Sequence, residues 1–203
     1  MHVTELDTSQ YPHCISGTPN ESGTGRSQGT LHLSRIYRDM AESALLAQSD
    51  SSDPAVIEML NWYAAGGWMW EHAFNRAYAD SVVSGDLVRP DEFELDGIVG
   101  SPDLIRISDW TLIELKFRWM SSNKFDALEK WFWLEMIQCK GYCKLIGTDH
   151  CELHVFFCNG DYRPPVPRVR AVALEFTEQE IEESWQSLKN HAIRRGWLPQ
   201  SQQ

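Results

Sequence analysis

Basic residues are scarce in this sequence. The 203-residue chain has 18 lysines and arginines against 29 aspartates and glutamates, which gives a formal net charge of −11. A protein that coats nucleic acid through bulk positive charge is therefore excluded. The balance still allows an enzyme that binds phosphate locally, through a small basic rim around an acidic site.

Cysteine is also sparse, with five residues and no Cys-x-x-Cys pair. The odd number and the lack of a signal peptide predict reduced thiols in a cytoplasmic protein. Because iron–sulfur ligands usually include tightly spaced cysteines, we expect no iron–sulfur cluster. No apolar run approaches transmembrane length, so we expect no membrane partner. The five cysteines are Cys14, Cys139, Cys143, Cys151 and Cys158.

The sequence does contain enough apolar material for a packed core. Hydrophobic residues make up 42% of the chain, and nine are tryptophans. This length and composition predict one domain, which we place at residues 31–197. Residues 1–30, rich in Ser, Gly and Thr, are expected to form a flexible N-terminal arm, and residues 198–203 a loose tail.

Hydrophobic periodicity and turn residues predict an α/β (α+β) fold, with a central mixed β-sheet flanked by helices. Thr177 and Glu180 show the capping-box pattern of a helix start. In chain order we expect helices at about 35–47 and 54–79, a turn at 85–90, strands at 92–99, 104–107 and 111–115, a helix at 124–145, strands at 151–158 and 166–176, and a final helix from 178 to about 195.

The stretch Gly100–Lys116 is the most informative part of the chain. It is typical of two short strands joined by a turn at Ser108-Asp109. Glu114 and Lys116 are two residues apart, so on a strand they share one face. The turn brings Asp103 back beside Glu114. The hairpin therefore predicts two carboxylates and one ammonium group in a small volume.

A divalent cation explains such a cluster, which is otherwise costly because like charges repel and burial removes hydration. Mg²⁺ prefers oxygen and is typically held by one or two carboxylates, waters and phosphate. Asp96 is an alternative acid, but Asp103 is preferred because it follows Pro102 at hairpin distance from Glu114. The alternative to a metal site is a surface hairpin with an exposed Glu–Lys pair.

Pro102-Asp103 followed by Glu114-Leu115-Lys116 resembles the signature of the PD-(D/E)XK nuclease superfamily, in its RecB-like, lambda-exonuclease-like or phage-type exonuclease branch. The resemblance covers about residues 64–158. It implies a restriction-endonuclease-like core and a metal-dependent DNA nuclease, most similar to exonucleases of phage recombination or repair. One or two Mg²⁺ or Mn²⁺ ions would be bound by Asp103, Glu114 and the backbone carbonyl of Leu115, with Lys116 orienting or deprotonating the attacking water.

Residues on the predicted helices extend the resemblance. Glu71 interrupts a predicted stripe of apolar and small residues, and the family implies that it completes the metal site. Gln138 and Tyr142 form a Q-x-x-x-Y pattern that the family places against the substrate phosphate or a water, with Glu135 on the same stripe as a further acid. The alternatives are a glutamate at the edge of a buried stripe, paired with Arg76, and a polar edge position followed by a core tyrosine.

The resemblance also implies partners. DNA is the expected substrate, cleaved to leave a 5′-phosphate, with Lys140 and Arg118 among the residues that contact it. Trp119 and Trp131 are candidates for stacking on an unpaired base. The cell would be bacterial or phage-infected, and a single-strand-binding or annealing protein and a homo-oligomer are further partners that the family allows. The alternative functions are a non-catalytic nucleic-acid-binding or assembly protein, and an enzyme of the same fold that cuts RNA or a modified strand.

Overall fold

The computed structural model describes residues 1–7, 31–46, 86–157 and 168–199. Its elements, in chain order, are β1 (His2–Leu6), β2 (Leu31–His32), α1 (Leu33–Leu46), β3 (Leu87–Val88), β4 (Phe93–Leu95), β5 (Ile98–Gly100), β6 (Leu104–Arg106), β7 (Thr111–Arg118), the short 3-10 helix η2 (Ser122–Ala127), α3 (Leu128–Trp131), α4 (Trp133–Ile146), β8 (His150–Phe157), β9 (Arg168–Glu175) and α5 (Glu178–Arg194). The predicted helix at 54–79 lies outside the described residues.

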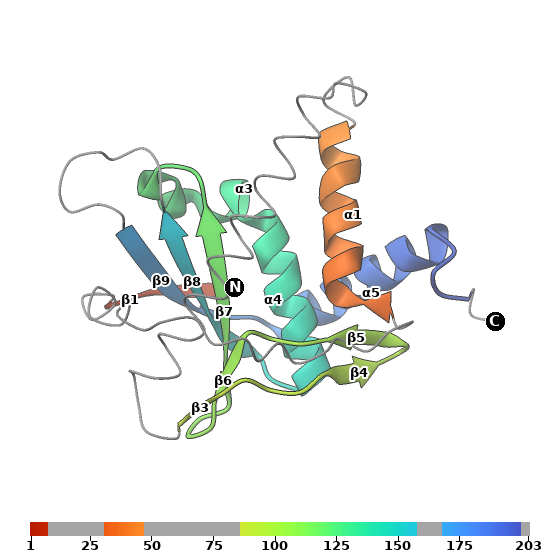
Figure 1. Ribbon diagram of the computed structural model, residues 1–203, viewed down its shortest axis with the longest axis horizontal. Helices are drawn as coiled ribbons and strands as arrows, with labels where there is room; N and C mark the ends of the chain where they lie inside the picture. Colours follow the sequence, from red (N-terminus) through yellow and green to blue (C-terminus); the bar gives the residue numbers. More distant parts are fainter. Residues whose placement is uncertain (8–30, 47–85, 158–167, 200–203) are drawn as a thin grey trace, which may run out of the picture.

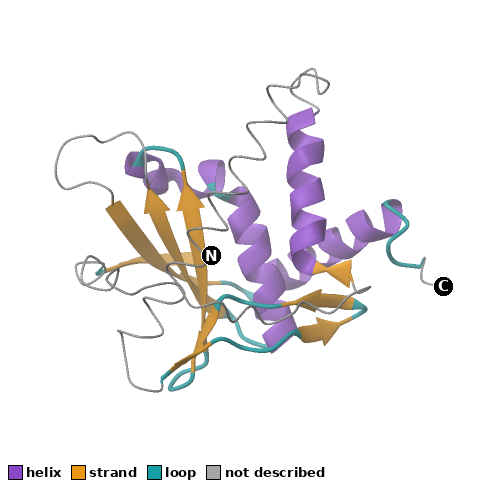
Figure 2. Cartoon of the chain, viewed as in Figure 1, coloured by secondary structure: helices purple, strands orange, loops and turns teal. Residues whose placement is uncertain are grey.

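The strands form two sheets (Figures 1 and 2). The larger has six strands in the order β1-β9-β8-β7-β6-β3, and the smaller has the order β2-β5-β4. In the larger sheet only β7 and β8 run parallel, and the chain between them passes through η2, α3 and α4. Figure 1 shows α1, α4 and α5 gathered on one side of this sheet. The predicted mixed sheet with flanking helices is confirmed.

The helix-covered face of the sheet carries the main core. Alternate residues of β8, namely Cys151, Leu153, Val155 and Phe157, lie in one buried cluster with residues of α4 and α5 such as Tyr142 and Trp185. Strand alternation places one side chain in two on that face, and the parallel pairing with β7 shields the edge of β8. The helices therefore cover the face of β7 that also presents Glu114 and Lys116.

The opposite face of the sheet has a smaller core of Leu104, Ile113 and Leu115. Two buried polar residues of β8 share this face. Glu152 binds Arg106 at 2.6 Å and lies 2.8 Å from Nε2 of His154. Burial lowers the pKa of His154 to about 3, so the imidazole is neutral. An ion pair and a neutral histidine therefore satisfy the polar groups behind the central strand.

The N-terminal arm predicted over 1–30 is wrong at its start. Residues His2–Leu6 form edge strand β1, which pairs antiparallel with β9 from His2↔Glu175 to Leu6↔Ala171. This strand depends on its partner, because its own side chains are mostly exposed. At the other end, Leu198 packs against the main core, so the predicted loose tail begins with an ordered residue.

The single strand predicted at 92–99 is also wrong, because the segment is a hairpin of β4 and β5. Asp96 and Gly97 form its turn with φ angles of 55° and 76°. Positive φ at both central residues is typical of the type I′ turn that Asp-Gly favours. The turn at 85–90 differs as well, since Leu87 and Val88 pair with β6 as a short strand.

The helix predicted at 124–145 is three pieces. It is interrupted at Phe132, which adopts φ −125° and ψ 24° and is fully buried. Burying this ring against Phe125 and Phe157 turns the chain between α3 and α4. Aromatic packing therefore overrides continued helix at this position. The break also directs the neighbouring residues outward.

Helix α5 begins at the predicted capping box. The Thr177 side chain accepts from the Glu180 backbone, and the Glu180 carboxylate accepts from the Thr177 backbone. Glu180 also accepts a hydrogen bond from the Met1 ammonium group at 3.0 Å.

Cys139, Cys143 and Cys151 are buried free thiols. Among the described residues, none of the helices combines the length and the apolar character that a membrane crossing requires.

The environment of Glu180 predicts that part of the protein's folding stability is lost in acid. Hydrogen bonds from the Thr177 backbone and the N-terminal ammonium group lower the pKa of Glu180 from 4.5 to about 2. The carboxylate therefore stabilises the fold above pH 4.5, and this stabilisation is lost as the pH falls toward 2. In urea denaturation, Glu180→Gln should be less stable than the parent near neutral pH, with a difference that shrinks in acid. A difference that stays constant would contradict the assignment.

Candidate active site

The hairpin of β6 and β7 fixes the position of the two candidate acids. Its turn is held by Asp86, whose carboxylate accepts from the Ser108 backbone at 2.8 Å and from its hydroxyl at 2.9 Å. The register pairs Leu104 with Ile113, and one step further places Asp103 opposite Glu114. Asp103 Oδ2 then accepts a hydrogen bond from the Leu115 backbone N–H at 2.8 Å. The hairpin therefore brings both carboxylates together beside the middle of β7.

Lys116 completes this group. Glu114 is 1% exposed, and its carboxylate forms an ion pair with the Lys116 ammonium group. The same ammonium lies 3.3 Å from the backbone oxygen of Leu115. Burial alone would lower the pKa of Lys116, but the carboxylate of Glu114, with Tyr37 and Asp103, raises that pKa above its ordinary value. Lys116 is therefore a cation held among acids.

Helix α4 presents Gln138 and Tyr142 to this group. Both side chains are buried, and Gln138 Nε2 donates to the Tyr142 hydroxyl at 3.2 Å. Burial, followed by the negative charges of Glu114 and Asp103, raises the pKa of Tyr142 well above its usual value. The phenol therefore stays neutral. Gly100 permits this approach, because a Cβ there would lie 2.9 Å from the ring of Tyr142.

Arg118 and Glu135 link the far end of β7 to the start of α4. They form an ion pair in which Glu135 is 3% exposed and Arg118 is 31% exposed. Burial lowers the pKa of Arg118, while Tyr37 and Glu114 act in the opposite direction. The predicted acid on the Gln138 stripe is thus a partner of the predicted phosphate-contacting arginine.

Tyr37 of α1 is a site residue that the sequence did not reveal. Its phenol interacts electrostatically with Lys116, Arg118 and Tyr142, which places it beside the group. The sequence assigns Tyr37 to the apolar side of its helix, one turn after Leu33. A signal was present, since a hydroxyl on a buried stripe needs a polar neighbour. The partners, however, lie about 80 to 105 residues further along the chain.

The structure does not bring every predicted site residue to the group around Glu114. Lys140 lies 5.3 Å from the ring of Phe176 and 4.0 Å from Glu180, against α5. Asp96, the alternative acid, accepts from Trp185 at 2.9 Å and Lys189 at 2.8 Å, which lower its pKa. It therefore anchors α5 and does not join Asp103. Glu71 lies outside the described residues.

The donor set of the hairpin fits a hard divalent cation. Asp103, Glu114 and the carbonyl of Leu115 offer only oxygen atoms, the ligands that Mg²⁺ prefers and Mn²⁺ accepts. Within the described ranges, no three His, Cys, Asp or Glu side chains converge to hold a metal ion. The described part of the chain therefore offers two carboxylates and a carbonyl as oxygen donors, and the further carboxylate predicted from the sequence, Glu71, lies outside the described residues.

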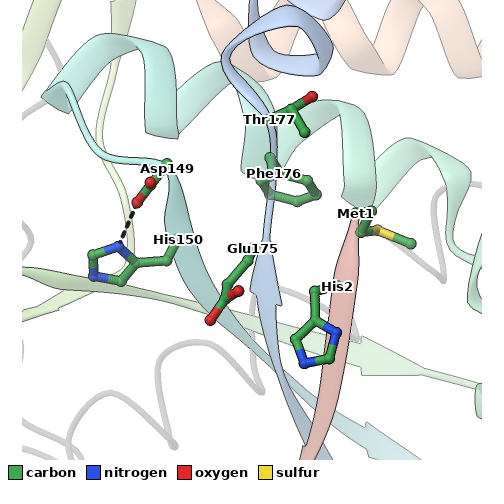
Figure 3. A pocket seen from close by; sticks show the side chains of 7 residues that line it. All are labelled: Met1, His2, Asp149, His150, Glu175, Phe176 and Thr177. Atoms are coloured by element: carbon green, nitrogen blue, oxygen red, sulfur yellow. Dashed lines mark hydrogen bonds and ion pairs between the residues drawn. The ribbon is translucent and has the colours of Figure 1, made fainter.

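A pocket lies where β1, β8 and β9 meet the start of α5 (Figure 3). It contains two histidines and two acids, of which His150 Nδ1 and Asp149 Oδ1 lie 2.8 Å apart. The lining residues are Met1, His2, Asp149, His150, Glu175, Phe176 and Thr177. None of them belongs to the group around Glu114, so this depression is separate from the candidate active site.

Comparison with solved structures shows which known proteins share the fold. No protein-family model and no curated protein matches the sequence. The chain is similar to the crystal structure of a phage-related exonuclease from Haemophilus somnus 129PT, with a TM-score of 0.50, 17% identity, and coverage of 90% of this chain and 89% of that chain. It is also similar to an alkaline exonuclease, LHK-Exo, from Laribacter hongkongensis, with a TM-score of 0.49, 16% identity, and coverage of 82% and 87%. The first similarity confirms the predicted fold class, a restriction-endonuclease-like core.

The Arg118–Glu135 pair generates a stability prediction. Glu135→Leu leaves a largely buried guanidinium unpaired and should cost about 3 kcal/mol in urea denaturation, the low end of the usual range because Arg118 keeps 31% exposure. The double variant Arg118→Met/Glu135→Leu should recover most of this loss, since two apolar groups replace the pair. Equal stability of the single variant and the parent would show that the pair does not hold α4 on β7.

Proposed function

We propose that this protein is a Mg²⁺- or Mn²⁺-dependent deoxyribonuclease, a phosphodiester hydrolase of the exonuclease type. The observation that carries the proposal is the convergence of Asp103, Glu114 and Lys116 beside the middle of β7. Two carboxylates and an amine in this order along a hairpin match the resemblance to the PD-(D/E)XK superfamily. The fold supports the same class, since a neighbour that shares it is a phage-related exonuclease.

The metal would be held by Asp103, Glu114 and the carbonyl oxygen of Leu115, with Glu71 as the further carboxylate. When bound, a divalent ion polarises a phosphoryl oxygen and lowers the pKa of a coordinated water. The hydrogen bond from Leu115 N–H orients one carboxylate, and Lys116 holds the other. The protein therefore presents the oxygen donors already arranged.

The remaining polar residues serve the DNA. Lys116 supplies a fixed positive charge that can orient the attacking water beside the phosphate. Arg118 lies two residues further along the same strand face and can bind the next phosphate as a fork of donors. Gln138 and Tyr142 of α4 offer neutral hydrogen-bonding groups. They add no negative charge to the carboxylates of Asp103 and Glu114, so they do not increase the repulsion of DNA phosphates.

Substitutions at the hairpin test the proposal. Asp103→Asn, Glu114→Gln and Lys116→Ala should each slow cleavage of linear duplex DNA in Mg²⁺ by about 10²- to 10⁴-fold, because each removes a charge at the reacting phosphate. Cleavage is followed on gels with linear, circular and single-stranded DNA, each with Mg²⁺, Mn²⁺ or EDTA. Asp149→Asn, which changes an exposed carboxylate in the bend before β8, should cut as fast as the parent.

Each outcome of this assay is informative. Linear DNA that shortens while circular DNA survives indicates an exonuclease, and cleavage of both indicates an endonuclease. DNA binding without cleavage in either metal would contradict the proposal in favour of a non-catalytic binding protein. Full activity of all three hairpin variants would contradict the assignment of the site.

Metal binding itself gives an independent prediction. An ion that binds only the folded state stabilises it by about 2.7 kcal/mol at 100 times its dissociation constant. Thermal unfolding of the parent should therefore shift upward with Mn²⁺ or Mg²⁺, and Asp103→Asn/Glu114→Gln should lose most of the shift. Asp149→Asn should keep it. A shift of equal size in the double variant would place the ion elsewhere.

A further inference from the structure

Helix α1 packs on α4 in a way that fixes the position of Tyr37. Leu33, in the first turn of α1, contacts Gly141 of α4, where a Cβ would lie 2.9 Å from the leucine side chain. The two helices run in opposite directions (Figure 1). One turn further along α1 therefore corresponds to one turn earlier along α4. Tyr37 thus lies beside the turn of α4 that carries Gln138.

The contacts of α1 with α5 set the direction in which Tyr37 points. Asp39 accepts a hydrogen bond from Arg195 Nε at 2.6 Å, and Ser43 Oγ accepts one from the same guanidinium group at 2.9 Å. At about 100° per residue, Asp39 is turned by about 200° from Tyr37 around the helix axis. Because Asp39 faces α5, Tyr37 faces the other way, toward α4 and β7.

The phenol of Tyr37 also lies near the two cations of β7. Burial lowers the pKa of Arg118, and of the two groups that oppose this effect Tyr37 acts more strongly than Glu114. Burial also acts to lower the pKa of Lys116, which Glu114 and then Tyr37 raise above its ordinary value. Electrostatic effects weaken with distance. The electrostatics therefore agree with the helix packing that Tyr37 stands beside Lys116 and Arg118.

The Tyr37 hydroxyl differs from its polar neighbours because it is not engaged with another side chain. Within the described residues it makes no hydrogen bond, and the side chain is partly exposed. Its neighbours are engaged in the pairs Lys116–Glu114, Arg118–Glu135 and Gln138–Tyr142. A phenol hydroxyl can donate one hydrogen bond. An uncommitted donor beside two cations suits an anion with several oxygen atoms, such as a phosphate.

We propose that the Tyr37 hydroxyl donates a hydrogen bond to the DNA phosphate bound by Arg118, next to the phosphate that is cut. The inference rests on the proposed nuclease function and adds a residue that positions its substrate. Along β7, Lys116 lies between the carboxylate of Glu114 and Arg118. A phosphate shared by Tyr37 and Arg118 therefore neighbours the one at the oxygen donors of the hairpin.

Removal of the hydroxyl alone tests this role. Tyr37→Phe keeps the ring, so its unfolding temperature should equal that of the parent. In cleavage of linear DNA with Mg²⁺, the variant should raise KM about 10- to 150-fold, the range for a hydrogen bond to a charged group, and leave kcat within about twofold. The bond is present in the ground state and in the transition state alike, so it contributes to binding and not to the chemical step.

Binding without cleavage gives a second measurement. A short fluorescent strand of the same DNA, titrated in EDTA, should lose affinity for Tyr37→Phe by a factor similar to the rise in KM. Ser43→Ala is the matched control, because it removes a hydroxyl from the same helix on the side that faces α5. This variant should bind and cut DNA as the parent does.

A modified substrate identifies the phosphate. A methylphosphonate replaces one charged oxygen of a chosen phosphate with a methyl group, which removes a hydrogen-bond acceptor. Linear DNA with one methylphosphonate next to the cleaved bond should be cut more slowly by the parent. The penalty should be smaller in Tyr37→Phe, because this variant has already lost the bond. Products resolved to single nucleotides give the cleavage rate at each bond.

The outcomes separate this inference from the proposed function. If the parent cuts DNA and Tyr37→Phe has the KM and the affinity of the parent, Tyr37 does not bind the substrate and the proposed function stands. A lower kcat with unchanged KM also overturns the inference. Equal methylphosphonate penalties in the parent and the variant, at every phosphate beside the cleaved bond, overturn the assignment of the phosphate. A parent that neither binds nor cuts DNA overturns the proposed function itself.

Discussion

The hydrogen bond from the Leu115 backbone to Asp103 is the constraint on which the candidate site depends. It extends the pairing of β6 and β7 by one residue, so that the side chain of Asp103 replaces a backbone acceptor. A strand alternates its faces, and a slip of one residue would carry Glu114 and Lys116 to the opposite face. The buried Leu104, Ile113 and Leu115 oppose such a slip, since they would have to enter the polar group. Apolar packing on one face of the sheet therefore fixes which residues of β7 present their charges on the other face.

Much of this hairpin could be predicted because its signals are local. Alternation gave the strands, and the spacing of Glu114 and Lys116 gave their shared face. The capping box of Thr177 and Glu180 was equally local and is confirmed. The β4–β5 turn also had a local signal, since Asp-Gly is a strong hairpin dipeptide. The apolar residues on both sides of Asp96-Gly97 instead suggested a single strand over 92–99.

The parts that could not be predicted depend on distant residues. Strand β1 forms because β9 offers it an edge, and nothing in its own exposed side chains requires a strand. Tyr37 reaches the site only because α1 lies beside the sheet on the same side as α4 (Figure 1). The interruption at Phe132 follows from aromatic partners on η2 and β8. Periodicity describes one element at a time and contains no information on these pairings.

Helix geometry explains why α4 can serve the site with one face and the fold with the other. Gln138 and Tyr142 are four residues apart and share the side facing β7, whereas Lys140 is turned by about 200° from Gln138. That rotation directs Lys140 to α5 and leaves the acidic hairpin without its charge. Arg118 and Lys116, both from β7, then provide the described cations nearest to the carboxylates. Under the proposed function, the cations of the strand would bind a phosphate at the hairpin, while Gln138 and Tyr142 of the helix supply neutral groups beside it.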